Sequence, residues 1–154
     1  MLLVTAVMVV GIRLGTQAYV KSVSMSEAQQ LCSTLTTKVS DELRYAGTIK
    51  VDSTTKTVSF FSKSFGKNSG DLRSFTQNED GQVTLGATKI ITSTSYPHNL
   101  KAKVDLSFEP PTSNSNFDNG VFTATITVYR TSETVVLATT TFQVEPLNHV
   151  YSAT

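Results

Sequence analysis

Residues 26–46 read SEAQQLCSTLTTKVSDELRYA. In this stretch the apolar side chains recur every three or four residues, at Ala28, Leu31, Leu35, Val39, Leu43 and Ala46. That spacing places them in a single stripe along an α-helix, and Gly47 supplies a C-terminal stop. The stretch therefore predicts a helix whose stripe packs on a sheet, and the expected packing residues are Leu31, Leu35, Val39 and Leu43.

The helical pattern extends back to the start of the sequence, because residues 1–46 contain no proline. The opening, MLLVTAVMVVGI at residues 1–12, carries no charge, and Arg13 follows it without a turn signal. Twelve residues make about 18 Å of helix, whereas a spanning helix needs about 20 apolar residues. We expect residues 1–15 to be the remnant of a transmembrane helix and residues 16–46 to be amphipathic. The side chains expected to pack on neighbouring helices are Val4, Val7, Met8, Val10, Ile12 and Leu14.

Three interpretations of this short apolar run compete. It can be a secretory signal peptide cleaved after Ala18, although no basic residue precedes it. It can also be a buried helix of a soluble domain. The third interpretation is a spanning segment whose N-terminal part is missing, because translation was assigned to an internal methionine. We favour the third, since it explains both the shortness of the run and the lack of a basic residue ahead of it.

After Gly47 the apolar period changes to two, which indicates β-strands. Turn residues separate strands expected near Thr48–Val51, Thr57–Ser62, Leu72–Thr76, Gln82–Leu85, Lys89–Thr92, Leu100–Phe108, Val121–Tyr129 and Val135–Val144. The short connection at residues 131–133 predicts that 121–130 and 134–145 pair as a hairpin. The predicted fold is α+β: a long N-terminal helix over residues 1–46, packed on an antiparallel β-meander head over residues 47–154.

Composition excludes several classes of function. The net charge of +1 gives no reason to expect a nucleic-acid partner. The sequence holds 24 Thr and 18 Ser, a bias that is common in secreted β-proteins. Its single cysteine, Cys32, allows neither an intrachain disulfide nor a cysteine-cluster metal site, and it lies within the apolar stripe.

The arrangement resembles type IV pilins and the pseudopilins of secretion systems. The stretches Ser26–Leu35 and Ser40–Ala46 are similar to the post-membrane helix of prepilin-type proteins from Gram-positive, clostridium-like bacteria. The resemblance covers residues 1 to about 50 and implies a pilin-like fold. In the family, a Gly-Phe-Ser/Thr-Leu-Val/Ile-Glu signal precedes the apolar run and is cut and methylated by a prepilin peptidase. That signal and its glutamate are absent from this sequence, so we expect the DNA upstream of the Met1 codon to encode it in frame.

Motifs for catalysis and metal binding are weak. Ser64 and Lys67 match a Ser-x-x-Lys pattern but lie in a glycine-rich turn, and His98 and His149 are isolated loop histidines. The segment Asn114–Gly120 places oxygen atoms at alternate positions, as calcium loops do, yet its last three residues are explained by a tight turn. We therefore assign no catalytic, cofactor or metal site, and leave calcium binding at Asn114–Gly120 open.

Three phenylalanines, Phe60, Phe61 and Phe65, cluster in and after one predicted strand. Because neighbouring strand residues point to opposite faces, Phe60 or Phe61 is expected to pack on the helical stripe. The other is then free to be exposed as a subunit contact.

The expected function is that of a structural subunit of a type IV pilus or of a type II secretion-like pseudopilus. The small, threonine-rich head favours a minor subunit. Its expected partners are other pilin or pseudopilin subunits, the assembly platform and the membrane. The helix would cross the cell membrane once, with the β-head on the extracytoplasmic side, and the assembled subunit would stand in a cell-surface filament. The alternative is a secreted β-sandwich binding or adhesion module with an N-terminal signal peptide.

Overall fold

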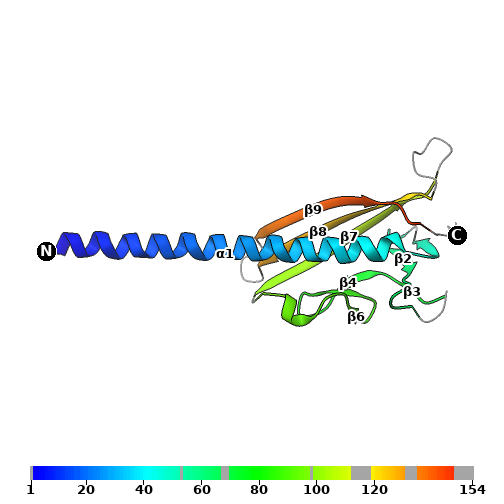
Figure 1. Ribbon diagram of the computed structural model, residues 1–154, viewed down its shortest axis with the longest axis horizontal. Coiled ribbons are helices and arrows are strands. Elements are labelled where there is room, and N and C mark those ends of the chain that lie inside the picture. Colours follow the sequence, from blue (N-terminus) through cyan, green and yellow to red (C-terminus); the bar gives the residue numbers. More distant parts are fainter. Residues whose placement is uncertain are drawn as a thin grey trace.

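The computed structural model describes residues 2–52, 54–66, 70–97, 99–111, 119–130 and 135–147, with side chains described from Ile12 onward. In this part of the chain one long helix, α1 (Leu2–Arg44), lies along a head made of three antiparallel sheets. The N-terminal half of α1 projects beyond the head, and its C-terminal half lies against it (Figure 1). The predicted combination of a long helix and antiparallel strands is therefore present.

The helix ends two residues earlier than its apolar stripe. The N–H of Ala46 donates to the carbonyl of Leu43 at 3.2 Å. This hydrogen bond reaches back three residues and not four, so the chain makes a tighter turn here than in an α-helix. The N–H of Gly47 donates to the carbonyl of Phe61 at 2.9 Å, so the chain is drawn into the first sheet. The terminal carbonyl of Arg44 accepts a bond from the N–H of Leu147 at 2.9 Å, and the far end of the chain thereby caps the helix.

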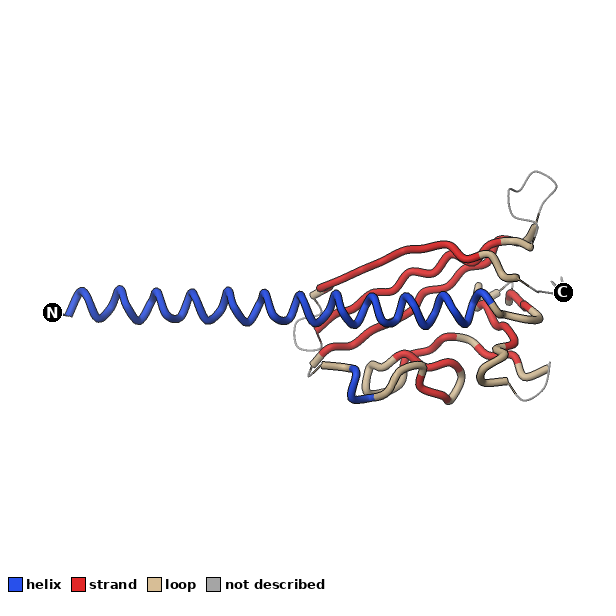
Figure 2. Tube along the Cα trace, in the orientation of Figure 1, coloured by secondary structure: helices blue, strands red, loops and turns tan. Residues whose placement is uncertain are grey.

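The first two sheets are small and follow each other along the chain (Figure 2). One contains β1 (Ile49–Val51), β2 (Val58–Phe61) and β3 (Leu72–Arg73). The other contains β4 (Phe75–Gln77), β5 (Val83–Leu85) and β6 (Thr88–Lys89). Within each sheet, neighbouring strands are consecutive in the sequence, which is the meander order.

Two predicted strands are corrected by these sheets. The strand expected over Leu72–Thr76 is divided at Ser74, because β3 pairs with β2 whereas β4 pairs with β5. The strand expected over Lys89–Thr92 already ends at Lys89. Its next two residues, Ile90 and Ile91, are both buried, which strand alternation does not allow, and they lead into a 3-10 turn, η1 (Ser93–Ser95). The expected single meander is thus three separate three-stranded meanders in the described residues.

The third sheet is the largest and carries the helix. It consists of β7 (Leu100–Glu109), β8 (Val121–Arg130) and β9 (Val136–Val144), in that order. The hairpin predicted for residues 121–130 and 134–145 is confirmed, with Ile126 opposite Thr140. Along β8, buried and half-buried residues alternate as predicted, and the buried row lies in the same core as the helical stripe. That row consists of Phe122, Ala124, Ile126 and Val128.

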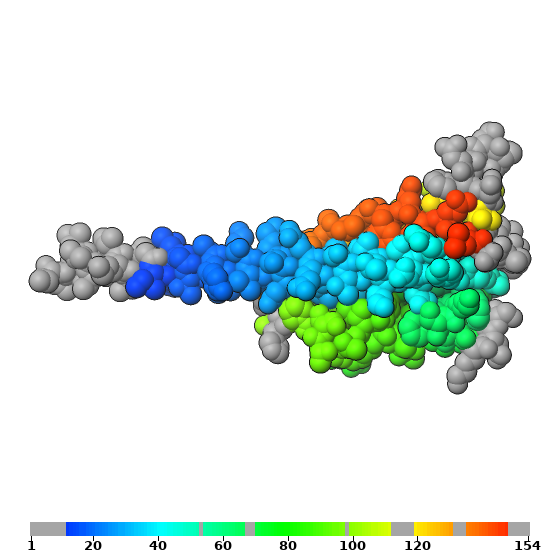
Figure 3. Space-filling view, in the orientation of Figure 1, coloured from blue at the N-terminus to red at the C-terminus, as the bar shows by residue number. Residues whose placement is uncertain are grey.

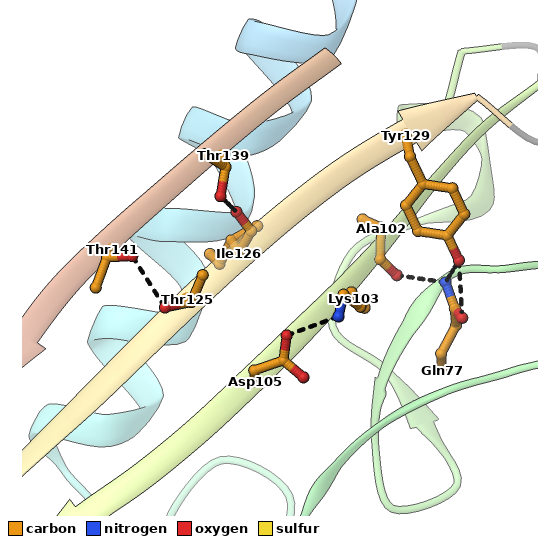
Figure 4. A network of polar contacts seen from close by, with 9 residues as sticks. All are labelled: Gln77, Ala102, Lys103, Asp105, Thr125, Ile126, Tyr129, Thr139 and Thr141. Atoms are coloured by element: carbon orange, nitrogen blue, oxygen red, sulfur yellow. Dashed lines mark hydrogen bonds and ion pairs between the residues drawn. The ribbon is translucent and has the colours of Figure 1, made fainter. Parts of the chain in front are cut away.

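Polar side chains join the second sheet to the third and β9 to β8 (Figure 4). The amide of Gln77 in β4 donates to the carbonyl of Ala102 in β7 and to the hydroxyl of Tyr129 in β8, each at 2.8 Å. On the hairpin, the hydroxyls of Thr125 and Thr141 lie 2.9 Å apart. The bonds of Gln77 hold the second sheet against the third, and the bond between Thr125 and Thr141 holds β9 against β8.

Tyr96 makes the stability of the head sensitive to alkaline pH. Its hydroxyl accepts a hydrogen bond from the N–H of Val83 at 2.8 Å, and burial raises the pKa of the phenol above its usual value of 10.0. A raised folded-state pKa stabilises the fold below about pH 10, and this stabilisation is lost as the pH rises through the folded-state pKa. We therefore expect the free energy of unfolding to fall above pH 10, and Tyr96→Phe to make that fall smaller.

The measurement is denaturant unfolding at a series of pH values between neutral and strongly alkaline. At neutral pH, Tyr96→Phe should cost about 1 kcal/mol, because the N–H of Val83 loses its acceptor. Tyr45→Phe is the matched control, since the side chain of Tyr45 is 53% exposed. A steep alkaline fall that Tyr96→Phe leaves unchanged would contradict the assignment to Tyr96.

Candidate functional site

The projecting part of α1, which we call the stalk (residues 2–26), is the most distinctive surface of the described chain. From Ile12 to Ser26 every side chain is exposed except that of Ser24, which is half-buried. Several of these side chains are large and apolar, and Ile12 is 71% and Leu14 61% exposed. The other large apolar ones are Tyr19, Val20, Val23 and Met25. Figure 3 shows residues 12–26 of the stalk extending away from the head.

The structure places the predicted helix-packing residues on this stalk. Ile12 and Leu14 are exposed there. The remaining four lie within α1, but their side chains are outside the described part of the structure: Val4, Val7, Met8 and Val10. The stalk therefore presents Ile12 and Leu14 where another molecule can reach them. Within the described residues, no helix is both long and apolar enough to span a membrane.

The predicted helix-to-sheet residues lie on the second half of α1. Leu31, Leu35, Val39 and Leu43 are all buried, and they belong to one apolar core with the buried row of β8. The helix contacts both β8 and β9. Cys32, which the sequence places in the stripe, is buried beside them, with its sulfur 3.4 Å from the hydroxyl oxygen of Thr140 in β9.

A groove opens where the stalk leaves the head, and we call it the basal groove. Its volume is about 790 Å³. One wall belongs to α1 and the other to the end of the β8–β9 hairpin. The lining residues are Arg13, Thr16, Gln17, Val20, Lys21, Ser24, Arg130, Val135 and Leu137. The guanidinium of Arg130 donates a hydrogen bond to the hydroxyl of Ser24, which links the two walls.

Phe60, Phe61 and Phe65 are buried or partly buried, and they pack mainly in or against the core. Phe60 is fully buried, with its ring centroid 5.4 Å from that of Phe75 and 6.0 Å from that of Phe122. It shares the core with the helical stripe, as one of the pair was expected to do. Phe61 is half-buried, and its ring lies against Gly47 and Gly66. Phe65 is also partly buried against the core, so this cluster does not form the exposed contact that was considered for it.

The motifs considered for chemistry lie largely outside the described residues. His98, His149, Lys67 and residues 114–118 of the possible calcium loop are among these undescribed positions, and Ser64 is an exposed turn residue. Asn119 and Gly120 are described, and the N–H of Asn119 donates to the carboxylate of Glu145 at 3.2 Å. Among the described residues, no group of three or more His, Cys, Asp or Glu side chains could hold a metal ion.

The basal groove was not foreseen from the sequence. Arg130 lies more than a hundred residues from Ser24, and only the packing of the hairpin on α1 brings them together. A periodic signal on the helix was available, however. Arg13, Gln17, Lys21 and Ser24 follow one another at steps of three or four and continue the buried stripe backwards from Ala28.

Comparisons with protein-family models, with curated proteins and with solved structures found no match to this chain.

Proposed function

We propose that this chain is a structural subunit of an envelope-anchored filament, of the type IV pilus or pseudopilus kind, and that it assembles through its stalk. The observation that carries the proposal is the division of α1 into two halves. One half is buried in the head, and the other extends into the surroundings with large apolar side chains exposed.

Away from the basal groove, the described stalk side chains have apolar surface that no other described part of the chain covers. An isolated helix in water gains little from propensity alone, and most helical stability in proteins comes from packing of an apolar face. Contiguous apolar surface on a protein marks a contact with another protein or with a membrane. The exposed apolar side chains of the stalk lie on two faces of α1: Ile12, Tyr19 and Val23 recur at helical steps on one face, and Leu14 and Met25 lie on the other. Packing against the stalks of neighbouring subunits would cover them in a filament.

The uncharged start of the sequence supports membrane storage before assembly. Residues 1–12 contain no charged side chain, and about 18 Å of helix reaches roughly halfway through a hydrocarbon core of about 30 Å. With these residues in the apolar layer, the head would stand on the extracytoplasmic side. Its threonine-rich third sheet would then face outward from the filament axis. The small head favours a minor subunit.

Photo-crosslinking in the native host tests the assembly. A benzoyl-phenylalanine placed at Ile12 or at Leu14 samples the neighbours of the stalk, and one placed at the exposed Lys63 samples the head as a matched control. We expect the stalk positions to yield covalent products with subunits that carry their own N-terminal apolar helix, because these helices pack together. Mass spectrometry of the products identifies the partner.

Two results would overturn the proposal. The first is a stalk probe that yields no product with any helix-bearing subunit in cells that express the protein at its native level. The second is a native chain that begins near Tyr19. The buried part of α1 begins at Ala28, so cleavage after Ala18 would leave all the core residues of the helix in place. A mature chain of that kind would favour the secreted binding module instead.

A further inference from the structure

We infer that the basal groove binds the headgroups of anionic phospholipids and thereby docks the head on the membrane surface before assembly. This inference rests on the proposed membrane-seated state of the chain. It assigns to the groove a partner of definite chemistry: the phosphate-bearing surface of a bilayer with negative charge.

The charge of the groove favours an anionic occupant. Its described lining includes three cationic side chains, Arg13, Lys21 and Arg130, and no acidic one. Arg13 and Lys21 form no ion pair with any described residue. Arg130 is held at the groove by its bond to Ser24, so its position between hairpin and helix is defined. Glu133, in the connection between β8 and β9, lies outside the described residues.

Arg13 and Lys21 lie on the face of α1 that is turned toward the head. The steps from Arg13 to Gln17, Lys21, Ser24 and Ala28 are four, four, three and four residues. Residues at such steps share one face of a helix, and Ala28 on that face is already buried under the head. The cations therefore occupy the space between stalk and head, where a docked membrane surface would lie.

The positions of Arg13 and Lys21 along the axis of α1 match the position of the lipid headgroup layer. Arg13 directly follows the uncharged residues 1–12, and Lys21 stands about 12 Å further along the axis at 1.5 Å per residue. Helical side chains lean towards the N-terminus, so both cations reach back towards the apolar segment. The headgroup layer of one leaflet is roughly 5–8 Å thick, and its field extends about 8 Å further at physiological salt. Both cations thus lie within reach of lipid phosphates.

The groove also has apolar walls, which distinguish a lipid from a free anion. Val20 of α1 and Val135 and Leu137 of the hairpin line it together with the cations. Val20 and Val135 are about half exposed. A phospholipid offers a phosphate and, beside it, the methylene groups of its headgroup and glycerol, so it can contact both kinds of side chain. A free phosphate would contact only the cations.

Vesicle co-sedimentation of the full chain tests the inference. One set of vesicles is phosphatidylcholine alone, and in the other about a third of the lipid is phosphatidylglycerol. We expect tighter binding to the anionic vesicles, and a loss of that preference by about 25-fold in Arg13→Gln/Lys21→Gln, at about fivefold for each cation removed. Lys38→Gln/Lys63→Gln is the control, because it removes the same charge from exposed positions outside the groove lining.

The outcomes separate this inference from the proposed function. Equal binding to neutral and anionic vesicles, or an equal loss in the control, would overturn headgroup binding while leaving membrane seating intact. Binding to neither kind of vesicle would overturn both. If Arg13→Gln/Lys21→Gln loses the binding of inorganic phosphate alone but keeps the preference for anionic vesicles, the groove takes a free anion, and the lipid assignment is wrong.

A fluorescence measurement locates the contact. The sequence contains no tryptophan, so Val20→Trp places a unique fluorophore in the groove, and Tyr45→Trp places one at the exposed end of α1. On anionic vesicles, we expect a blue shift and quenching by a lipid that carries the quencher on its headgroup for Trp in place of Val20, and neither for Trp in place of Tyr45. The same response at both positions would contradict docking at the groove.

Discussion

Replacing Leu35 by alanine is expected to lower the free energy of unfolding by about 3 kcal/mol, within the range of about 2–5 kcal/mol known for buried leucines. Leu35 is 0% exposed and lies in the middle of the helical stripe. It belongs to the core that α1 shares with the buried row of β8. The truncated side chain would leave a cavity between two rigid elements, which cannot close around it without moving the helix off the sheet.

Leu14→Ala is the matched control on the same helix, because Leu14 is 61% exposed on the stalk. It should change the free energy of unfolding by less than about 0.5 kcal/mol. Guanidinium unfolding followed by the near-ultraviolet circular dichroism of the tyrosines measures mainly the head, because Tyr96 packs against the core there whereas Tyr19 of the stalk is exposed. Equal losses in the two variants would mean that α1 does not contribute its second half to the core.

Replacing Gly120 by alanine is expected to cost about 2–3 kcal/mol, because it combines backbone strain with a steric clash. Gly120 has a φ of 75°, in the left-handed region that side chains disfavour. A Cβ there would lie 2.6 Å from the carbonyl oxygen of Glu109 and 2.7 Å from the ring of Phe108. The carbonyl belongs to the backbone of β7, so it can move only if the pairing of β7 with β8 shifts.

The control is Gly70→Ala, since no atom of the described residues, its chain neighbours aside, lies within 4 Å of the Cβ that it would add. Thermal melting of both variants and of the unchanged chain gives the comparison. We expect a clear drop in the midpoint for Gly120→Ala, and little change for Gly70→Ala. If Gly120→Ala melts at the midpoint of the unchanged chain, the close approach of β7 to this turn is wrong.

The elements with a long, regular pattern could be predicted from the sequence alone. The stripe from Ala28 to Ala46 repeats often enough to define a helix and its buried face, and Leu31, Leu35, Val39 and Leu43 are buried. In β8, the alternation of apolar residues with threonines from Phe122 to Val128 indicated both the strand and its inner face. Such patterns report on local geometry, since they require only that one side of an element is buried.

The shorter elements could not be predicted in this way. Strands of two or three residues, such as β3, β4 and β6, contain less than two full periods of alternation. Their partners are decided by long-range pairing, and so the break at Ser74 and the end of β6 at Lys89 appeared only in the structure. The hydrogen bond from the N–H of Leu147 to the carbonyl of Arg44 also joins residues far apart in the sequence, so it too appeared only in the structure.

The candidate site shows the same division. Sequence alone determined that the chain begins with an uncharged segment, continues as one helix and changes to strands after Gly47. The steps that place Arg13 and Lys21 on the face of the buried stripe are also present in the sequence. Only the tertiary structure decided that Arg130 joins them and that a groove lies between stalk and head. The physical reason is that periodicity fixes the directions of side chains on one element, whereas their neighbours across space depend on how separate elements pack.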